Sequence, residues 1–212
     1  MDMKKSVLIL FACLIYSGAA RAADDCLVYK LHPRITIDVP AWTKEVVQPL
    51  QRMSLLHGNV VATLVDNYDI IADITPIEDG FCVALKGVDA QIGYSNFTVQ
   101  IDISHVPNTC SYNAILAHED EHIRSYLSVI DDYKEGLHKS VFNAADSIMP
   151  IFVKNESDID SAINGLNDQL QAHPDLILIM QQIKAAEEIR NKRVDQNDTG
   201  AVLRRCYVSD VK

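Results

Sequence analysis

The chain has 212 residues, of which 48% are hydrophobic and 23% are charged, and its formal net charge is −10. These values are ordinary for a globular protein and allow one domain with a substantial core. A nucleic-acid partner requires a basic surface, so the acidic balance argues against nucleic acid among the partners of this protein.

The first 22 residues have the pattern of a secretory signal peptide. Lys4 and Lys5 form a short positive region, residues 6–16 form an apolar run, and Ala20-Arg21-Ala22 is a small-residue cleavage site. The apolar run is too short to span a bilayer, so we expect no membrane span after cleavage. Residues 23–212 are therefore predicted to be exported, either to the periplasm or out of the cell.

Four cysteines remain once residues 1–22 are removed, and an even number in an exported chain indicates two disulfides. They are Cys26, Cys82, Cys110 and Cys206. Of the three possible pairings we expect Cys26–Cys206, which would tie the two ends of the chain, and Cys82–Cys110, which would tie a strand to the start of a helix. Free buried thiols are the alternative for some of them. A cysteine zinc site is disfavoured because the chain has no C-x-x-C.

Residues 23–106 are predicted to be rich in strands. Short β-type runs occupy Leu27–Lys30 and Arg34–Val39, and apolar residues at helical spacing predict a helix from Pro40 to about Met53. Two pairs of strands are expected after it, namely Asn59–Val65 with Tyr68–Ile74 around the turn Asp66-Asn67, and Phe81–Val88 with Ile92–Ile103 around Asp89-Ala90-Gln91. In the last of these runs apolar and polar residues alternate, which is typical of a strand with one buried face.

Residues 107–212 are predicted to be helical. Pro107-Asn108-Thr109 ends the last strand, and Ser111 is the expected N-cap of a helix from Tyr112 toward Ile148, with Gly136 as the place of a kink or break. Two more helices are expected, over Ser157–Gln171 and from Pro174 to about Arg193. Strands followed by helices predict one α+β domain over residues 23–212.

One motif carries chemistry, the H-E-x-x-H of His118-Glu119-Asp120-Glu121-His122. Residues four apart lie one turn apart on one helix face, so the Nε2 atoms of His118 and His122 can reach a single zinc ion. Glu119 is then the expected general base, which takes a proton from water and passes it to the leaving amine. The motif therefore predicts a zinc metallopeptidase that acts on peptide or protein substrates.

Residues 106–122 also support a resemblance. The stretch Val106-Pro107-Asn108-Thr109-Cys110-Ser111-Tyr112-Asn113, followed by Ile115-Leu116-Ala117-His118-Glu119 and His122, resembles a bacterial family of predicted secreted zinc-dependent proteases. The resemblance covers about residues 30–145, and its most specific part is the cysteine followed by the H-E-x-x-H motif. It implies a minimal zincin-like fold with a small sheet, an active-site helix and helices after it. It also implies that His118 and His122 bind zinc and that Glu119 is the general base. Apart from the resemblance, the alternating strand upstream of the helix lies where zinc peptidases place the edge strand that pairs with an extended substrate, so we expect an edge strand there.

The third zinc ligand is left open by the sequence, although a catalytic zinc site takes three protein ligands. The extension H-x-x-G-x-x-H of metzincins is absent, and gluzincins instead place a glutamate on a later helix. Candidates after His122 are Asp131, Asp132, Glu135, His138, Asp146 and Glu156. We expect His138 before the others, on condition that the helix breaks near Gly136, because on an unbroken helix His138 lies nearly opposite His122.

Three other interpretations of the motif remain. The motif can belong to a charged helix face with ion pairs such as Asp120–Arg124. Glu119-x-x-His122 and Glu135-x-x-His138 match the two E-x-x-H motifs of di-iron bundles, which stand on different helices in those proteins. The chain can also be an exported binding module, or an inactive zincin, whose C-terminal helices bind a protein partner through residues such as Leu176, Ile179, Ile183 and Ile189.

Overall fold

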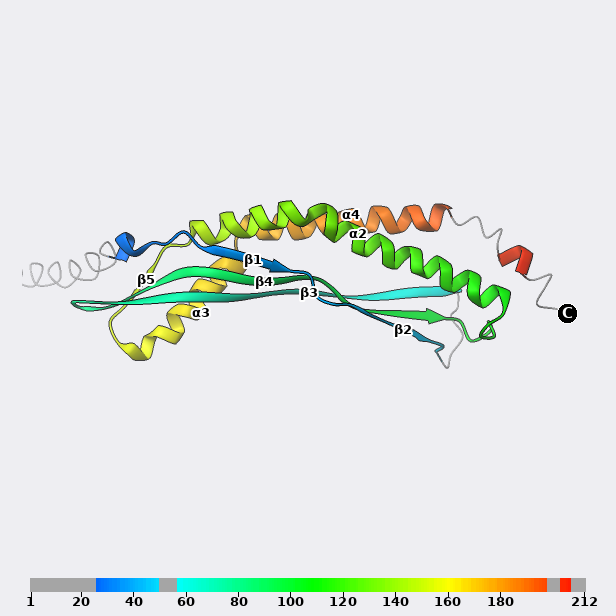
Figure 1. Ribbon diagram of the computed structural model, residues 1–212, viewed down its shortest axis with the longest axis horizontal. Helices are drawn as coiled ribbons and strands as arrows, with labels where there is room; N and C mark the ends of the chain where they lie inside the picture. The colour runs from blue at the N-terminus through cyan, green and yellow to red at the C-terminus, as the bar shows by residue number, and fades with distance from the viewer. Residues whose placement is uncertain (1–25, 50–56, 198–202, 207–212) are drawn as a thin grey trace, which may run out of the picture. The chain divides into compact units, whose positions relative to one another are not determined.

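The computed structural model describes residues 26–49, 57–197 and 203–206, and the predicted signal peptide lies outside them. Its elements are, in order, the 3-10 helix η1 (Leu27–Tyr29), strands β1 (Arg34–Asp38), β2 (Thr43–Val47), β3 (Gly58–Ile77) and β4 (Gly80–Ile101), helix α2 (Cys110–Ser147), strand β5 (Ile151–Val153), the 3-10 helix η2 (Glu156–Asp158), and helices α3 (Ile159–Gln171) and α4 (Pro174–Asn197) (Figure 1). The fold is α+β, with a sheet followed by helices, as predicted. In the part of the chain that is described, no helix has the length and apolarity needed to cross a membrane.

Strand β4 is the strand with which the others pair. The sheet order is β1-β4-β2, and β3 and β5 also pair with β4. Strand β2 runs parallel to β4, with Thr43 opposite Asn96, and β5 runs antiparallel to it, with Phe81 opposite Val153. The strand upstream of the motif helix is therefore central in the sheet, and the prediction that it is an edge strand was wrong.

The two predicted turns in the strand region are absent, because β3 and β4 are each one continuous strand. Asp66-Asn67 lies inside β3, and Asp89-Ala90-Gln91 lies inside β4. At the second site Asp89 and Gln91 are exposed and Ala90 is buried, as in a half-buried strand, whereas at the first site Asp66 and Asn67 are both exposed. At both sites the polar residues that suggested turns are exposed residues of a continuous strand.

The predicted helix from Pro40 and the predicted strand at Leu27–Lys30 were also wrong. Thr43–Val47 forms strand β2, which includes three β-branched residues that favour extended structure. The end of the predicted helix, near Met53, lies outside the described residues. Leu27–Tyr29 forms the 3-10 helix η1 directly after Cys26, a cysteine that is fully buried in a disulfide.

The helices follow the predictions more closely. Thr109, and not Ser111, caps α2, because its Oγ1 accepts a hydrogen bond from the Tyr112 backbone N–H at 3.4 Å. Helix α2 continues without a break through Gly136, where an added Cβ would lie 3.2 Å from Ile179 of α4. Gly136 is therefore a place of close helix packing, and the predicted kink is absent. Helices α3 and α4 occupy the predicted regions, with α4 extending to Asn197.

All four cysteines form disulfides, but the expected pairing was wrong. The bridges are Cys26–Cys82 and Cys110–Cys206. The predicted pair of strands over residues 81–103 would have brought Cys82 back toward Cys110, whereas an unbroken β4 does not. Two disulfides fit a protein of an oxidising compartment.

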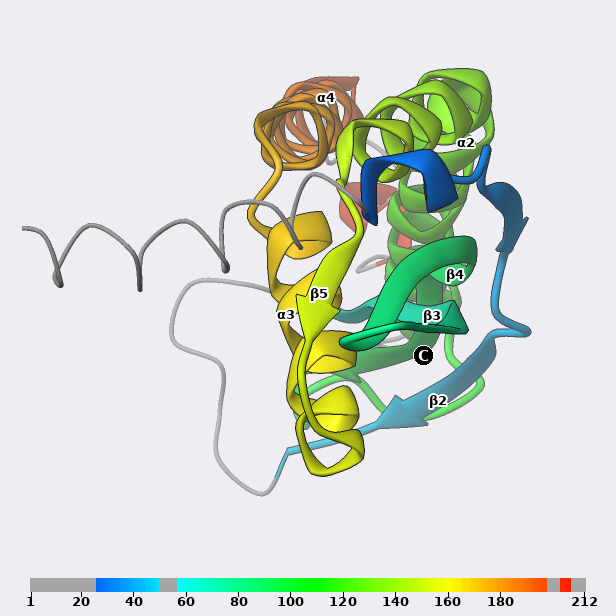
Figure 2. The same ribbon diagram turned by 90° about the vertical axis from the view of Figure 1, so that its left-hand side faces the viewer.

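The chain forms two compact units, and β3, β4, α2 and α4 contribute residues to both. The first unit contains residues 1–36, 68–89 and 139–177, and the second contains residues 37–67, 90–138 and 178–212. In the first unit α3 packs on β5 through a buried face of Ala162, Leu166 and Leu170. In the second unit α2 and α4 lie on the same side of the strands (Figure 2). Phe97, Val99 and Ile101 of β4 are fully buried in this unit. The predicted single domain over residues 23–212 stays a prediction.

Candidate metal centre

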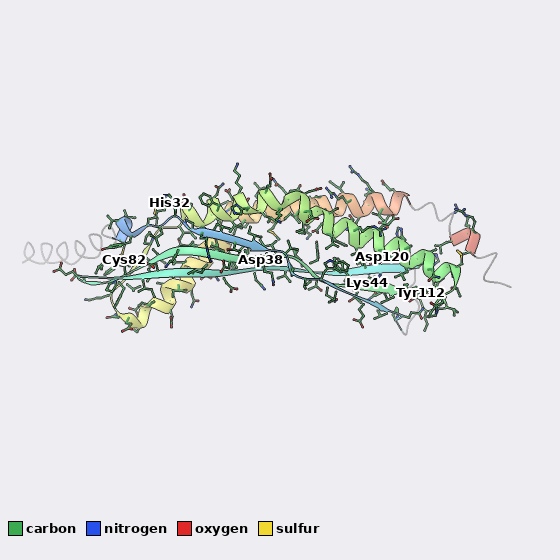
Figure 3. All side chains as sticks on the ribbon, viewed as in Figure 1. His32, Asp38, Lys44, Cys82, Tyr112 and Asp120 are labelled. Carbon is green, nitrogen blue, oxygen red and sulfur yellow. A yellow bond between two sulfur atoms is a disulfide. The ribbon has the colours of Figure 1, made fainter. Side chains whose placement is uncertain are left out.

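The motif lies in the second unit, on a part of α2 that packs against the sheet. Ile115, Glu119 and Ile123 follow one another at one-turn spacing, and each is at least 96% buried. On the flank of the helix, Asp120 forms an ion pair of 2.7 Å with Lys44 of β2, and Figure 3 shows the two side chains together. Helix α2 is thus fixed on the sheet by apolar contacts and one ion pair, with Glu119 as a charged residue inside the apolar face.

Helix α4 runs antiparallel beside this part of α2 (Figures 1 and 2). Arg190 of α4 donates a hydrogen bond to Ser128 at 2.7 Å and forms an ion pair with Asp132. Two residues of α4 at one-turn spacing contact the motif, namely Asn191 and Asp195, whereas Glu187, one turn earlier, contacts Tyr94 of β4. The polar contacts of Arg190, Asn191 and Asp195 join the two helices.

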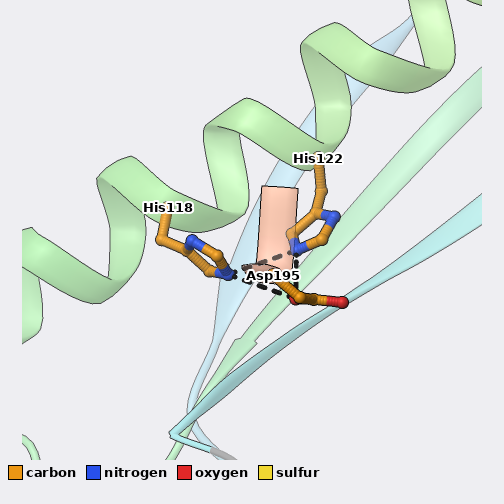
Figure 4. A group of neighbouring side chains, drawn as sticks. All are labelled: His118, His122 and Asp195. Atoms are coloured by element: carbon orange, nitrogen blue, oxygen red, sulfur yellow. Dashed lines mark hydrogen bonds and ion pairs between the residues drawn. The ribbon is translucent and has the colours of Figure 1, made fainter. Parts of the chain in front are cut away.

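Three side chains from the two helices converge on one point (Figure 4). The Nε2 atoms of His118 and His122 lie 3.2 Å apart. The Oδ1 atom of Asp195 lies 3.2 Å from His122 Nε2 and 3.5 Å from His118 Nε2. Among the described residues, these three form a group whose ligand atoms all lie within 4.8 Å of one another.

These distances fit a tetrahedral zinc site. Zinc binds nitrogen and oxygen ligands at about 2.0–2.1 Å, which places neighbouring ligand atoms of a tetrahedron about 3.3 Å apart. The three observed separations, 3.2, 3.2 and 3.5 Å, surround that value. Two imidazole nitrogens and a carboxylate oxygen are also a common donor set for zinc.

The orientation of His122 suits metal binding. Its Nδ1 lies 3.0 Å from Oδ1 of Asn191. An amide oxygen only accepts hydrogen bonds, so Nδ1 carries the ring proton and Nε2 keeps its lone pair for the metal. The side chains of His118 and His122 are 20% and 12% exposed, whereas that of Asp195 is 65% exposed, so solvent reaches the group from the side of Asp195.

Glu119, the predicted general base, is held against the sheet. A Cβ on Gly58 of β3 would lie 2.6 Å from the Ile115 side chain and closer still to the Glu119 carboxylate. Only glycine leaves room at this position of β3, so the carboxylate lies directly on the backbone of that strand. Its place on α2, one residue after His118, is the place that a general base of an H-E-x-x-H helix requires.

Comparison of the chain with protein-family models, with curated proteins and with solved structures found no match. The resemblance to secreted zinc-dependent proteases therefore rests on residues 106–122 alone. The convergence of His118, His122 and Asp195 is independent of that resemblance, because Asp195 lies outside the part of the chain that the resemblance covers.

A group of aromatic and polar side chains from α2, β4 and α4 surrounds Tyr126, one turn after His122 on α2. The ring of Tyr126 from α2 packs on Tyr94 and Phe97 of β4, with centroids 5.0 and 6.0 Å away. The Tyr94 hydroxyl donates a short hydrogen bond to Glu187 of α4. Burial is the largest cause that raises the pKa of Tyr94, of Tyr126 and of Glu187 above their ordinary values. Both phenols therefore keep their protons at neutral pH.

The structure brings His118 and His122 together with Asp195, a residue that was not among the candidates, whereas Glu119 packs on β3 at Gly58. His138 and Glu135 are exposed on helix α2 and do not join the group. His138 was expected as a ligand only if the helix broke near Gly136, and α2 is unbroken there. The two E-x-x-H motifs also lie on this one helix, whereas those of di-iron bundles lie on different helices. Of the other candidates, Asp132 pairs with Arg190 and Asp146 pairs with His32.

Asp195 was missed by the sequence interpretation. The signal for it is the recurrence of polar residues at one-turn spacing on a helix, Glu187, Asn191 and Asp195, which indicates a polar stripe that faces other polar groups. The charged-face interpretation of the motif holds only for the solvent side of α2. There Arg124 pairs with Glu121 at 3.8 Å, whereas Asp120 pairs with Lys44.

Proposed function

We propose that this protein is an exported zinc-dependent metallopeptidase, periplasmic or secreted, with His118, His122 and Asp195 as zinc ligands and Glu119 as general base. The observation that carries the proposal is the convergence of two imidazole nitrogens and one carboxylate oxygen at the spacing of a tetrahedral ligand set. The H-E-x-x-H motif and the resemblance of residues 106–122 to secreted zinc-dependent proteases support it. The zincin-like character of the fold is part of the same proposal.

The chemistry divides between the metal and the chain. Zinc, when bound, supplies the Lewis acid that polarises a peptide carbonyl and acidifies a water molecule. Glu119 accepts the proton of that water and returns it to the leaving amine nitrogen. The Glu119 carboxylate lies in the space that the missing Cβ of Gly58 leaves, which limits the positions open to the base. The exposed side of Asp195 gives a peptide or protein substrate access to the group.

Two features support an exported location. The disulfides Cys26–Cys82 and Cys110–Cys206 persist in oxidising compartments and are rare in the cytosol. The predicted signal peptide over residues 1–22 would direct the chain to such a compartment. The substrate is proposed as a peptide or protein on the chemistry of the motif.

The proposal is tested with the exported protein, residues 23–212, beside Glu119→Gln and His122→Ala. We expect about one zinc per chain in the wild type and in Glu119→Gln, and loss of zinc from His122→Ala. Peptide hydrolysis, followed by mass spectrometry on a mixture of unfolded proteins, should fall about 10²–10⁴-fold in Glu119→Gln, the usual contribution of a general base. Full hydrolytic activity in Glu119→Gln with zinc bound would refute the role of Glu119.

A second candidate function is a metal-binding module without hydrolysis. The 96% burial of Glu119 against β3 favours it, because a general base needs contact with water. Under this interpretation the wild type and Glu119→Gln bind zinc equally and neither hydrolyses any peptide. The same experiment therefore separates the two functions.

A further inference from the structure

Asn191 lies between a proposed zinc ligand and a buried tyrosine. Its Oδ1 accepts a hydrogen bond from Nδ1 of His122 at 3.0 Å. Its side-chain amide also lowers the pKa of Tyr126, against the larger effect of burial, which is the effect of an N–H directed at the phenolic oxygen. Because the oxygen of the amide faces His122, the NH₂ group is the part that can be directed at Tyr126. His122 and Tyr126 lie one turn apart on α2.

The orientation of this amide favours one tautomer of His122, against the Asp195 carboxylate 3.2 Å from Nε2, which favours the other in the absence of a metal. With Oδ1 toward the imidazole, the ring proton stays on Nδ1 and Nε2 is free. With the amide reversed, NH₂ would face Nδ1 and the proton would move to Nε2, the atom that points at Asp195 and His118. A reversed amide would therefore occupy the metal-binding nitrogen with a proton.

Tyr126 in turn is held by its neighbours. Its ring packs on Tyr94 and Phe97 of β4, so its hydroxyl has a fixed position relative to α4. Tyr94 bonds to Glu187, one turn before Asn191, and Arg190 bonds to Ser128 and Asp132 of α2. The position of Asn191 is set by contacts on both sides of it along α4.

We propose that Asn191 is the positioning residue of the metal centre and that it holds His122 in the tautomer whose Nε2 is free to bind zinc. The contact of Asn191 Oδ1 with His122 Nδ1 at 3.0 Å is the observation that carries this role. Asn191 does not contact the metal or the substrate and acts only through His122. The inference rests on the zinc site of the proposed function, and it adds a residue that the motif does not contain.

The test compares Asn191→Leu with Asn191→Asp in the exported protein. Leucine removes the acceptor at similar volume, whereas aspartate keeps an oxygen acceptor for His122 Nδ1. Gln196→Leu, an amide-to-leucine change at an exposed position of the same helix, is the matched control. Zinc affinity is measured by competition with a chromophoric chelator, and the His122 tautomer is measured by ¹⁵N NMR of the metal-free protein.

We expect Asn191→Leu to bind zinc about 10–100-fold more weakly, the usual effect of removing the partner of a zinc-binding histidine. Asn191→Asp and Gln196→Leu should stay within a few-fold of the wild type. The wild type should show a protonated Nδ1 and an unprotonated Nε2 in His122, and Asn191→Leu should lose this preference. A residue that only stabilised the fold would not change the tautomer.

The outcomes separate this inference from the proposed function. Unchanged zinc affinity and an unchanged tautomer in a folded Asn191→Leu protein would overturn the role of Asn191 and leave the zinc site standing. A wild type that binds no zinc, yet shows the Nδ1-protonated tautomer only when Asn191 is present, would overturn the proposed function and keep the positioning role. Absence of both zinc and the tautomer preference would overturn both.

Discussion

Gly58 of β3 leaves the space that the Glu119 carboxylate occupies. A methyl group there would fall 2.6 Å from Ile115 and closer to Glu119, so Gly58→Ala forces the proposed general base to move. We expect this substitution to lower hydrolysis strongly while zinc content stays near one per chain, because His118, His122 and Asp195 are untouched. The same overpacking should lower the free energy of unfolding by about 1–3 kcal/mol. Zinc analysis, peptide hydrolysis and urea unfolding measure the three quantities.

Gly136→Ala is the matched control for Gly58→Ala. The added methyl group at Gly136 meets only the end of the Ile179 side chain, at 3.2 Å, and alanine favours a helix over glycine by about 1 kcal/mol. We expect an unfolding free energy near that of the wild type and unchanged hydrolysis. Equal hydrolysis in Gly58→Ala and Gly136→Ala would show that the position of Glu119 does not matter to the reaction.

Glu187 should make the stability of the protein depend on pH. Burial raises the pKa of Glu187 above its ordinary value of 4.5, although the hydrogen bond from Tyr94 acts in the opposite direction. The carboxyl group therefore contributes stability that is fully present below pH 4.5 and is lost as the pH rises through the raised pKa, since ionisation then costs folding free energy. Glu187→Gln keeps an acceptor for the Tyr94 hydroxyl and has no charge to bury.

Urea unfolding at several pH values measures this effect. The unfolding free energy of the wild type, taken relative to Glu187→Gln, should decrease as the pH rises from below the ordinary carboxyl pKa toward neutrality. If the difference in unfolding free energy between the wild type and Glu187→Gln is constant or grows with pH, burial is not the dominant influence on the pKa of Glu187.

At the scale of the elements, the disulfide Cys110–Cys206 joins the first residue of α2 to a cysteine that follows α4 in the chain, and these two helices carry the proposed zinc ligands. Cys110 begins α2, eight residues before His118, and Cys206 follows Asp195 by eleven residues. Asp195 stands in the last turn of α4, where helices fray. We expect the free energy of unfolding of the double variant Cys110→Ala/Cys206→Ala to be about 2–5 kcal/mol lower than that of the wild type. We also expect this variant to bind zinc more weakly. Urea unfolding and chelator competition measure the two effects.

The second disulfide provides the control. Cys26–Cys82 belongs to the first compact unit, whereas all three proposed ligands belong to the second. Cys26→Ala/Cys82→Ala should therefore lose stability and keep its zinc affinity. Equal loss of zinc affinity in the two double variants would mean that the Cys110–Cys206 bridge has no specific role in holding Asp195.

The sequence predicted the helices better than the strands. Helix periodicity extends over many residues, so α3 and α4 were located nearly to their ends. Strand boundaries depended on single polar pairs, and Asp66-Asn67 is equally compatible with a turn and with the exposed face of a long strand. In the segment that forms β2, a few apolar residues have helical spacing, which led to the wrong prediction of a helix. The segment is extended because it pairs with β4. Pairing partners lie far away in the chain and leave no local signal.

At the scale of the whole molecule, the sequence predicted the part of the candidate site that lies on α2 and missed the part that lies on α4. His118, Glu119 and His122 follow one another on a single helix, so their proximity is a local property that the spacing determines. Asp195 lies 73 residues after His122 and reaches it only through the antiparallel packing of α4 on α2. Helix packing depends on the complete core, which the order of residues does not reveal. The disulfide pairing escaped prediction for the same reason.

The position of the third ligand has a consequence for the biosynthesis of the protein. Ribosomes make the two histidines first, and 73 further residues follow His122 before Asp195 emerges. A nascent chain thus holds only a two-nitrogen site, which binds zinc more weakly than the complete set of three protein ligands of a catalytic zinc. In a protein that acts as proposed, hydrolysis therefore begins only after α4 has been made and has folded onto α2. The order of synthesis itself delays the appearance of an active peptidase until the chain is folded.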